Sequence, residues 1–369
     1  MGKTYQFNTK VTTKGIILYI SPSISTDAVG GDIVNKRNLD FLKETGYIVH
    51  TYSLSKKKRF QTLLNLTSGY AGECGSSDIT NILNIVKGTN IKKLFISSSK
   101  LGLIARTVKK VRPDIEIITF FHNIEIDYSK QEYQINKSVK NYLILKAVQK
   151  NERLSVECSD KIICLNERDN NLLKKYYQRK CDYLLPISFD DQYKSASTVR
   201  EKTTDKLSLL FVGSDFYGNT EGLKWFIINV FPHTPDTKLI IIGKGMDKVF
   251  TPDNDRLIVK GYVKDLQAYY NDCDIVVLPI KSGGGMKTKT AEAMMYGCPI
   301  IGTEEAFEGY DLEPLKIGAE CKDAKEFIST ISNWDNNKKE EYSKYSRSVF
   351  LSKYNSKSLL TDFINFINK

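Results

Sequence analysis

The sequence predicts an α/β protein with two doubly wound parallel sheets, and three observations carry this prediction. In both halves of the 369-residue chain, short apolar runs alternate with longer amphipathic segments, which is the pattern of strand–helix–strand units in a parallel sheet. The apolar runs are continuous, as in strands that are buried on both faces. Residues 195–205 are polar and interrupt the pattern, which places a linker near residues 188–206.

The first half contains six predicted strands and at least four predicted helices. The strands are expected at residues 14–21, 47–52, 93–97, 115–121, 161–165 and 183–186, and the helices at 33–45, 101–111 and 139–158 and from 166 onward. Gly30 and Gly31 end a polar loop, residues 23–32, between the first strand and the first helix. A strand, a glycine loop, a helix and a second strand in this order are typical of a nucleotide-binding unit.

The second half repeats the alternation. Strands are expected at 207–213, 238–243, 257–261, 274–278 and 299–303, and helices at 223–230, 286–296 and 350–367. No internal sequence repeat and no low-complexity tract accompanies this alternation. We therefore expect a first domain at residues 1–190, joined by the tail helix at about 350–369, and a second domain at 206–349.

Residues 280–303 hold the most informative stretch. Gly283, Gly284 and Gly285 follow a buried strand and precede a helix, so backbone amides at the helix N-terminus are open to an anion. Lys287 and Lys289 add positive charge, and the carboxylate of Glu292 lies one and a half turns further on, where it can bond a ribose diol. A generic crossover turn with solvated lysines is the alternative, because a lone glycine run is a weak signal.

The run from Gly283 to Ile301, with Ala-Glu-Ala-Met-Met-Tyr-Gly-Cys-Pro, resembles the donor motif of retaining family 4 glycosyltransferases. The resemblance implies the GT-B fold of two facing Rossmann-like domains, with Glu292 as the second glutamate of the Glu-x(7)-Glu motif. The first glutamate would fall at Gly284 and is absent, as in a subgroup with a Gly-Gly-x-Lys-x-Lys pattern.

The same resemblance implies a set of site residues. Lys287 and Lys289 become the phosphate candidates, because the arginine–lysine pair common upstream in the family is missing after Gly213 and Ser214. His122, at the end of a predicted strand, is expected to face the donor sugar, and Asn123 and Glu125 are expected on the acceptor side. The nucleotide-sugar contacts implied are Gly30, Gly31, Gly213, Ser214, Gly243, Tyr262, Val263, Gly283, Gly284, Gly285, Met286, Lys287, Thr288, Lys289 and Glu292.

The composition limits cofactors and compartment. The seven cysteines form no Cys-x-x-Cys, and the three histidines do not cluster, so we expect no metal and a reducing compartment. The polar N-terminus shows no secretory signal, and no apolar run reaches the roughly 18 residues of a membrane helix. We therefore expect a cytoplasmic protein that needs no cofactor beyond its substrates.

The charge is divided unequally between the halves. Residues 1–200 carry a net charge of +13 and residues 201–369 a net charge of −2. The basic run from Lys56 to Arg59 precedes an amphipathic segment with Phe60, Leu63, Leu64 and Leu66, which favours contact with an anionic membrane surface. A solvated loop is the alternative, and nucleic acid is disfavoured because the basic residues lack interleaved aromatic platforms.

These observations predict a glycosyltransferase that moves a sugar from a nucleotide-sugar donor to an acceptor, with retention of configuration and without a metal. A glycan or lipid-linked precursor of a cell-surface polysaccharide is the expected acceptor, reached from the inner face of the cell membrane. Two alternatives stay open at this stage. One is a sugar-nucleotide epimerase of the same fold, and the other is a non-catalytic binding subunit of glycosyltransferase type.

Overall fold

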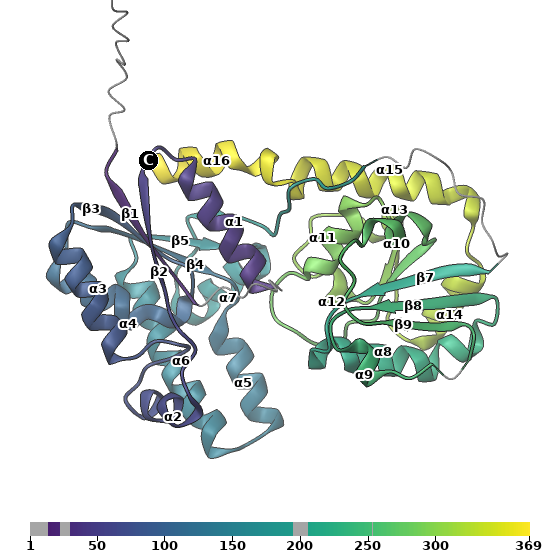
Figure 1. The fold of residues 1–369 in the computed structure, drawn as a ribbon, viewed down its shortest axis with the longest axis horizontal. Helices are drawn as coiled ribbons and strands as arrows, with labels where there is room; N and C mark the ends of the chain where they lie inside the picture. The colour runs from purple at the N-terminus through teal and green to yellow at the C-terminus, as the bar shows by residue number, and fades with distance from the viewer. Residues whose placement is uncertain (1–13, 23–29, 195–205, 253) are drawn as a thin grey trace, which may run out of the picture. The chain divides into compact units, whose positions relative to one another are not determined.

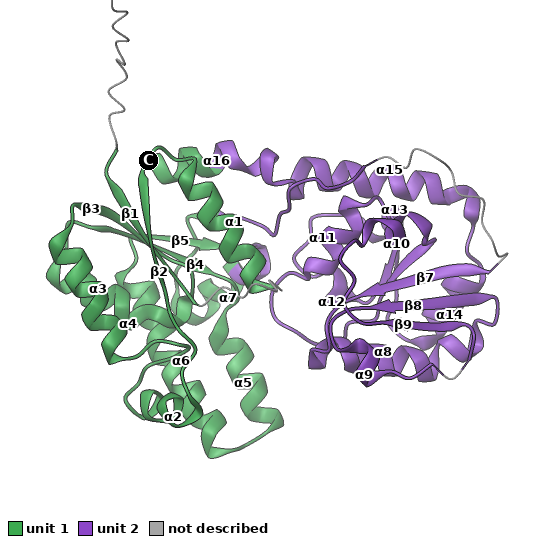
Figure 2. Ribbon diagram, viewed as in Figure 1, with its two compact units in different colours: residues 1–164, 170–183, 363–369 green, residues 165–169, 184–362 purple. Residues whose placement is uncertain are grey.

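The computed structural model describes residues 14–22, 30–194, 206–252 and 254–369. The chain divides into two compact units (Figure 2). Unit 1 comprises residues 1–164, 170–183 and 363–369, and unit 2 comprises residues 165–169 and 184–362. Part of the predicted linker (195–205) and part of the first glycine loop (23–29) lie outside the described residues.

Unit 1 is a six-stranded sheet with helices along the chain between its strands (Figure 1). The strand order is β2-β1-β3-β4-β5-β6, and the registered pairs run parallel. Its strands are β1 (Ile16–Ser21), β2 (Ile48–Ser53), β3 (Ile91–Ile96), β4 (Glu116–Phe121), β5 (Lys161–Cys164) and β6 (Tyr183–Leu184). Its helices include α1 (Gly31–Lys43), α2 (Arg59–Thr67), α3 (Ser76–Gly88), α4 (Gly102–Val111), α5 (Glu125–Ile135), α6 (Val139–Cys158) and α7 (Glu167–Tyr177).

Unit 2 is a second six-stranded parallel sheet, in the order β12-β11-β10-β7-β8-β9. Its strands are β7 (Leu207–Val212), β8 (Thr237–Ile242), β9 (Leu257–Lys260), β10 (Ile275–Leu278), β11 (Ile300–Gly302) and β12 (Gly318–Glu320). Its helices include α8 (Tyr217–Asn229), α9 (Met246–Val249), α10 (Gln267–Asp272), α11 (Thr288–Met295), α12 (Glu304–Phe307), α13 (Pro314–Ile317), α14 (Ala324–Ser332) and α15 (Lys339–Val349). The predicted α/β class with two doubly wound sheets is therefore confirmed.

The central strands of each sheet are buried because they are apolar on both faces. Ile17, Leu18 and Ile20 in unit 1 and Leu209, Leu210 and Phe211 in unit 2 are at most 1% exposed. The sequence analysis did not anticipate α3, α5 or β12. Helix α5 is polar and β12 is short, so both give little periodic signal, whereas α3 carries Ile79, Ile82 and Val86 at helical spacing, a signal that the sequence analysis overlooked. The predicted single helix at 350–367 is instead a π-helical segment (Phe350–Tyr354), a break at Asn355, and α16 (Ser356–Asn368). Residues 363–369 pack within unit 1, where Phe363 contacts Phe41.

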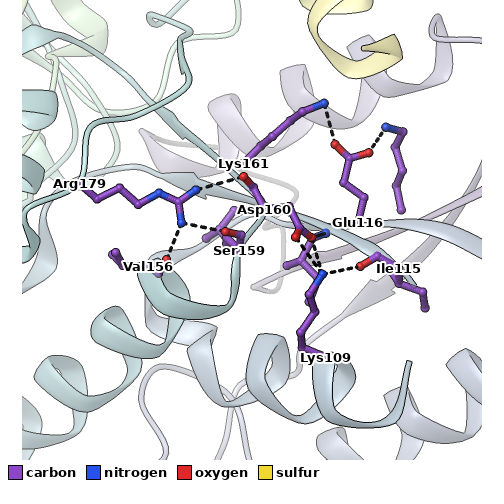
Figure 3. A network of polar contacts seen from close by, with 11 residues as sticks. Lys109, Ile115, Glu116, Val156, Ser159, Asp160, Lys161 and Arg179 are labelled. Atoms are coloured by element: carbon purple, nitrogen blue, oxygen red, sulfur yellow. Dashed lines mark hydrogen bonds and ion pairs between the residues drawn. The ribbon is translucent and has the colours of Figure 1, made fainter. Parts of the chain in front are cut away.

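The amino edge of the unit 1 sheet carries a dense network of ion pairs (Figure 3). Glu116, the first residue of β4, pairs with Lys93 and Lys161 from the neighbouring strands. Asp160 accepts hydrogen bonds from the backbone amide of Ile117 and from Lys109. Arg179 donates to the carbonyl oxygens of Val156, Ser159 and Asp160. Charged groups at this edge are thus paired with one another.

Candidate functional site

The candidate site of unit 2 lies where β7 and β10 are adjacent in the sheet. From this pair the strand order runs to β8 and β9 on one side and to β11 and β12 on the other. Loops at such a switch point diverge to opposite sides of the sheet, which is where open α/β sheets bind ligands. The loops concerned are residues 279–287 after β10 and residues 213–216 after β7.

The glycine loop adopts backbone conformations that its sequence requires. Gly283 has φ of 150° and Gly285 has φ of 64°, both in the region that favours glycine. Thr288 begins α11, with Lys287 in extended conformation before it. The start of α11 is tied to the chain after β11, because Thr290 donates to the carbonyl of Ala306 at 2.6 Å and Tyr310 to that of Lys287 at 2.6 Å. Buried Met286 contributes packing there.

Lys287 folds back beneath the glycine loop. Its ammonium group donates to the carbonyl oxygen of Gly285 at 2.7 Å and to Glu305 Oε1 at 2.5 Å. The side chain is only 9% exposed. Burial lowers the pKa of Lys287, and the ion pair with Glu305 opposes that shift. The charge of this lysine is therefore already balanced by a carboxylate.

Lys289 lies on the other side of the loop, against the end of β7. A Cβ atom placed on Gly213 would lie 2.7 Å from its Cε atom, and its ammonium group is 6.0 Å from the centroid of the Phe211 ring. Burial and the nearby Lys287 lower the pKa of Lys289 to about 8, while Glu292 opposes the shift. Among the described residues, no hydrogen bond or ion pair binds its ammonium group. This cation is therefore available to an anionic ligand.

Glu292 is held by an aromatic pair. It accepts a hydrogen bond from the hydroxyl of Tyr270 at 3.1 Å, and the Tyr270 ring stacks on Tyr296 with centroids 4.5 Å apart. Burial raises the pKa of Glu292, whereas the Tyr270 bond and Lys289 lower it. The contact with Tyr270 uses only Oε2, so Oε1 can still accept from a ligand hydroxyl.

The ends of β7, β8 and β9 approach closely beside these residues. A Cβ atom on Gly243 would lie 1.9 Å from the carbonyl oxygen of Gly213, so only glycine permits this contact. Ser214 accepts from the side chain of Asn219 through its carbonyl at 2.8 Å. Tyr262 is 75% exposed, and Val263 follows it in the loop after β9. The predicted nucleotide-sugar residues of the second half therefore lie at the carboxyl edge of the unit 2 sheet, after β7, β8, β9 and β10.

His122 lies at the end of β4 in unit 1 and is held as a neutral ring. Its Nε2 atom is 3.0 Å from Asn35 Oδ1 and 3.2 Å from the carbonyl oxygen of Ser97. Because a carbonyl only accepts, Nε2 carries the proton and Nδ1 remains an acceptor. Burial lowers the pKa of His122 to about 4, assisted by Lys100. The ring can thus accept a hydrogen bond from a ligand hydroxyl at neutral pH.

The other predicted residues of unit 1 lie near the same carboxyl edge. Gly30 has φ of 50° and precedes α1, and a Cβ atom on Gly30 or Gly31 would meet nothing within 4 Å. Asn123 follows His122, and Glu125 begins α5 with its carboxylate 3.2 Å from the ammonium group of Lys100. Buried Glu152 accepts from the backbone amides of Glu125 and Ile126 and fixes this turn.

Sequence reasoning missed several residues that shape the two edges. Tyr270, Glu305 and Asn35 contact predicted site residues across 22, 18 and 87 positions, and no local motif announces such distant contacts. Asp169, in the stretch predicted to open a helix, was not among the predicted site residues; it is fully buried, and burial raises the pKa of its carboxyl to about 7. Within the described parts of the chain, no group of three or more His, Cys, Asp or Glu side chains could hold a metal ion. Nor is any helix there long and apolar enough to cross a bilayer.

Comparison with known proteins adds a family match for the second unit. Residues 206–334 match the family Glycosyl transferases group 1. A curated relative, an uncharacterized 44.6 kDa protein in the cps region of Klebsiella pneumoniae, is 29% identical over 117 residues. That alignment covers 28% of this chain and 30% of the relative, so the chain matches less than a third of the relative's length.

Solved structures resemble the whole chain. Anabaena Alr3699/HepE in complex with UDP and glucose has a TM-score of 0.67 at 11% identity, covering 96% of this chain and 99% of its own. A glycosyltransferase from Rickettsia africae has a TM-score of 0.67 at 13% identity, covering 96% and 97%. The lipopolysaccharide outer core galactosyltransferase WaaB has a TM-score of 0.63 at 12% identity, covering 96% and 100%. At these identities the likeness shows the fold, which is that of GT-B proteins.

Proposed function

We propose, from the premise that residues 206–334 are a group 1 glycosyltransferase domain, that this chain transfers a sugar from a nucleotide-sugar donor to an acceptor. One observation carries the proposal. Lys289, Glu292 and the N-terminus of α11 meet at the switch point of the unit 2 sheet, together with the closely approaching glycines of β7 and β8. A cation, a ribose-binding carboxylate and free helix amides are the groups that a nucleoside diphosphate requires.

The reaction follows from the charges at this edge. When the bond between the anomeric carbon and the diphosphate oxygen breaks, negative charge grows on the diphosphate. Lys289 and the first amides of α11 stabilise that charge, which is the largest contribution that such sites make to rate. The acceptor hydroxyl attacks the same face of the sugar, so configuration is retained, and its proton passes to the departing diphosphate. Neutral His122 accepts from a sugar hydroxyl through Nδ1.

A metal is not needed in this scheme because lysine and helix amides carry the leaving-group charge. The test is a thermal-shift screen of uridine, guanosine and adenosine diphosphate sugars, with and without EDTA. We expect one nucleotide class to raise the melting temperature, and EDTA to leave that shift unchanged. Binding of no nucleotide sugar would contradict the proposal, and turnover of a donor's sugar without any acceptor would indicate an epimerase.

The proposed acceptor is a glycan or lipid-linked precursor of a cell-surface polysaccharide. Two relatives support this choice: one is a protein in a cps region, and WaaB is a lipopolysaccharide outer core galactosyltransferase. Such an acceptor would be met at the cytoplasmic face of the membrane. Incubation with the preferred donor and membranes of an acceptor-containing strain should label the lipid fraction, and labelling of soluble glycans alone would exclude a lipid-linked acceptor.

A surface of unit 1 supports membrane attachment. Phe60, Leu63 and Leu64 of α2 are exposed, and Ile135 and Val139, at the turn between α5 and α6, are 85% and 79% exposed. Helix α2 lies beside α6 (Figure 1). Leu66 of α2 packs against the cluster that contains Ala147 and Val148 of α6, so both exposed regions adjoin this helix. The exposed cations nearby are Lys56, Lys58, Arg59, Lys137 and Lys140.

One predicted cation of this surface is engaged elsewhere. Lys57 pairs with Asp78 at 3.0 Å and is mostly buried, so it contributes less than the sequence suggested. Each remaining cation close to an anionic leaflet contributes about 1 kcal/mol. Lys56, Lys58 and Arg59 changed to Ser should reduce sedimentation with anionic liposomes at low salt, whereas Lys322, Lys325 and Lys338 changed to Ser should not. Equal binding of both triple variants would contradict membrane attachment through this surface.

A further inference from the structure

The glycine loop of unit 2, Gly283 to Gly285, has no side chains, but the carboxylate of Glu305 comes close to it. A Cβ atom placed on Gly283 would lie 3.2 Å from Lys287 Cε and 4.0 Å from Glu305 Oε1. Glu305 belongs to α12, the short helix that follows β11. Its carboxylate therefore lies within van der Waals distance of the loop, just beyond the closer side chain of Lys287.

Glu305 is fixed in place but still accessible. The hydrogen bond from Thr290 to the carbonyl of Ala306 ties the residue after Glu305 to α11. The Glu305 side chain is 24% exposed. Its described contacts, the hydrogen bond and ion pair with Lys287, both use Oε1. Within the described residues Oε2 thus has no hydrogen-bond or ion-pair partner, so this carboxylate, held by Lys287, can still accept a hydrogen bond.

The strand order separates this carboxylate from the diphosphate site. Glu305 follows β11, the glycine loop follows β10, and Gly213 with Lys289 beside it marks the end of β7. Neighbouring strands lie about 4.8 Å apart, so the ends of β7 and β11 are separated by roughly 10 Å. A diphosphate that binds Lys289 and extends toward β11 would bring its attached sugar to Glu305. A carboxylate would repel the diphosphate itself, but it suits the hydroxyls of a sugar.

We propose that Glu305 binds hydroxyl groups of the donor's sugar and that Lys287 is the positioning residue that orients it. This inference rests on the proposed function and extends it to the class of sugar. A carboxylate accepts hydrogen bonds from a neutral, polyhydroxylated sugar and repels a sugar that carries its own carboxylate. The preferred donor is therefore a neutral hexose or amino sugar, and a hexuronic acid is rejected.

The alternative role for Glu305 is to neutralise buried Lys287 without touching a ligand. The two roles differ in what they do to nucleotide and nucleotide-sugar binding. A sugar contact is absent from the complex with the bare nucleoside diphosphate, so its loss changes only the affinity for the donor. Loss of a purely structural ion pair disturbs the loop and weakens both ligands together.

The test is calorimetry of the full chain with UDP, UDP-glucose and UDP-glucuronic acid, or with GDP, GDP-mannose and GDP-mannuronic acid if the protein prefers guanosine. Glu305→Gln should keep the affinity for the bare diphosphate within about twofold. It should weaken the neutral donor by about 10- to 100-fold, the range for a hydrogen bond to a charged group. It should also reduce the ratio between the affinity for the neutral donor and the affinity for the uronic acid donor. The exposed neighbour changed in the same way, Glu304→Gln, should alter none of these.

Three outcomes would contradict either the role of Glu305 or the proposed function. Equal weakening of diphosphate and donor in Glu305→Gln would assign the residue a structural role and overturn the inference. An unchanged affinity of Glu305→Gln for the neutral donor would also overturn the inference. If the wild type binds the donor in that case, the proposed function still holds. Failure of the wild type to bind any diphosphate or donor would instead contradict the proposed function. Lys287→Met should resemble Glu305→Gln in the loss of donor affinity, because it removes the group that orients the carboxylate.

Discussion

The carboxyl edges of the two sheets present side chains of different charge. In unit 1 the neutral edge presents His122, which is uncharged and whose proton is held by Asn35 and the carbonyl of Ser97, while the nearby Lys100 is paired with Glu125. In unit 2 the edge is charged, with two buried lysines and two glutamates around one helix start. A neutral ring suits hydroxyl groups, and the ammonium group of Lys289, which has no ion pair among the described residues, suits a diphosphate. The comparison teaches that similar sheets can present different electrostatics at the same position, because the loops differ.

The largest effect is expected from Lys289. Lys289→Met removes the unpaired cation of the charged edge and should lower turnover by on the order of 100-fold or more. In the wild type, kcat/KM should fall as the pH rises above about 8, where Lys289 of the free enzyme loses its proton. Lys289→Arg should remove that alkaline decline, while the different shape of its side chain should reduce the activity. A normal turnover in Lys289→Met would place the diphosphate elsewhere.

A smaller effect is expected from Glu292. Glu292→Gln should weaken nucleoside diphosphate binding by about 1–3 kcal/mol, the cost of a hydrogen bond to a charged group. Tyr270→Phe removes only the hydroxyl that holds Glu292. It should also weaken nucleoside diphosphate binding, but by less than Glu292→Gln. Isothermal calorimetry checks both, and unchanged affinity in Glu292→Gln would end its assignment to the ribose.

A change of His122, at the neutral edge of unit 1, should affect turnover without affecting nucleotide affinity. His122→Ala should reduce kcat by about 10-fold or more while the dissociation constant of the bare nucleotide stays nearly constant. Because burial lowers the pKa of His122 to about 4, the wild-type pH profile should show no step near 6.5 from this residue. A step near 6.5 that disappears in His122→Gln would mean that the histidine titrates and that its edge is not neutral.

The smallest effect on activity is expected at the amino edge of unit 1, where Glu116 pairs with Lys93 and Lys161. Burial alone would raise the pKa of Glu116, but hydrogen bonds from the two lysines outweigh it and lower the pKa. The pairing therefore contributes stability above the pKa of an unfolded glutamate, near 4.5, and loses it as the pH falls. Glu116→Gln should lower the free energy of unfolding at pH 7 by roughly 1–3 kcal/mol with unchanged kcat.

Asp114→Asn is the matched control for that experiment, because the exposed pair of Asp114 with Arg112 should contribute little. Chemical denaturation at pH 7 and pH 4 measures both variants. A difference between Glu116→Gln and the wild type that is as large at pH 4 as at pH 7 would contradict the ion-pair explanation. A fall in kcat would mean that the amino edge is linked to the reaction.

The sequence by itself determined the two sheets, because continuous apolar runs between amphipathic segments allow few other arrangements. It also determined the strand–glycine–helix turn at residues 283–296 and the place of Glu292 on α11, since both depend on neighbours close in the chain. Helix α5 escaped it, because it buries only Ile126 and Ser129 along its length and gives no clear period.

Only the tertiary structure decided which charged group meets which. The spacing of Lys287 and Lys289 makes them look equivalent, yet one folds beneath the loop onto Glu305 and the other lies against Gly213. The proton on His122 depends on Asn35, 87 positions away. These pairings are set by how strands that are distant in sequence become neighbours in a sheet, and strand order is a property of the packed chain that local residue patterns do not encode.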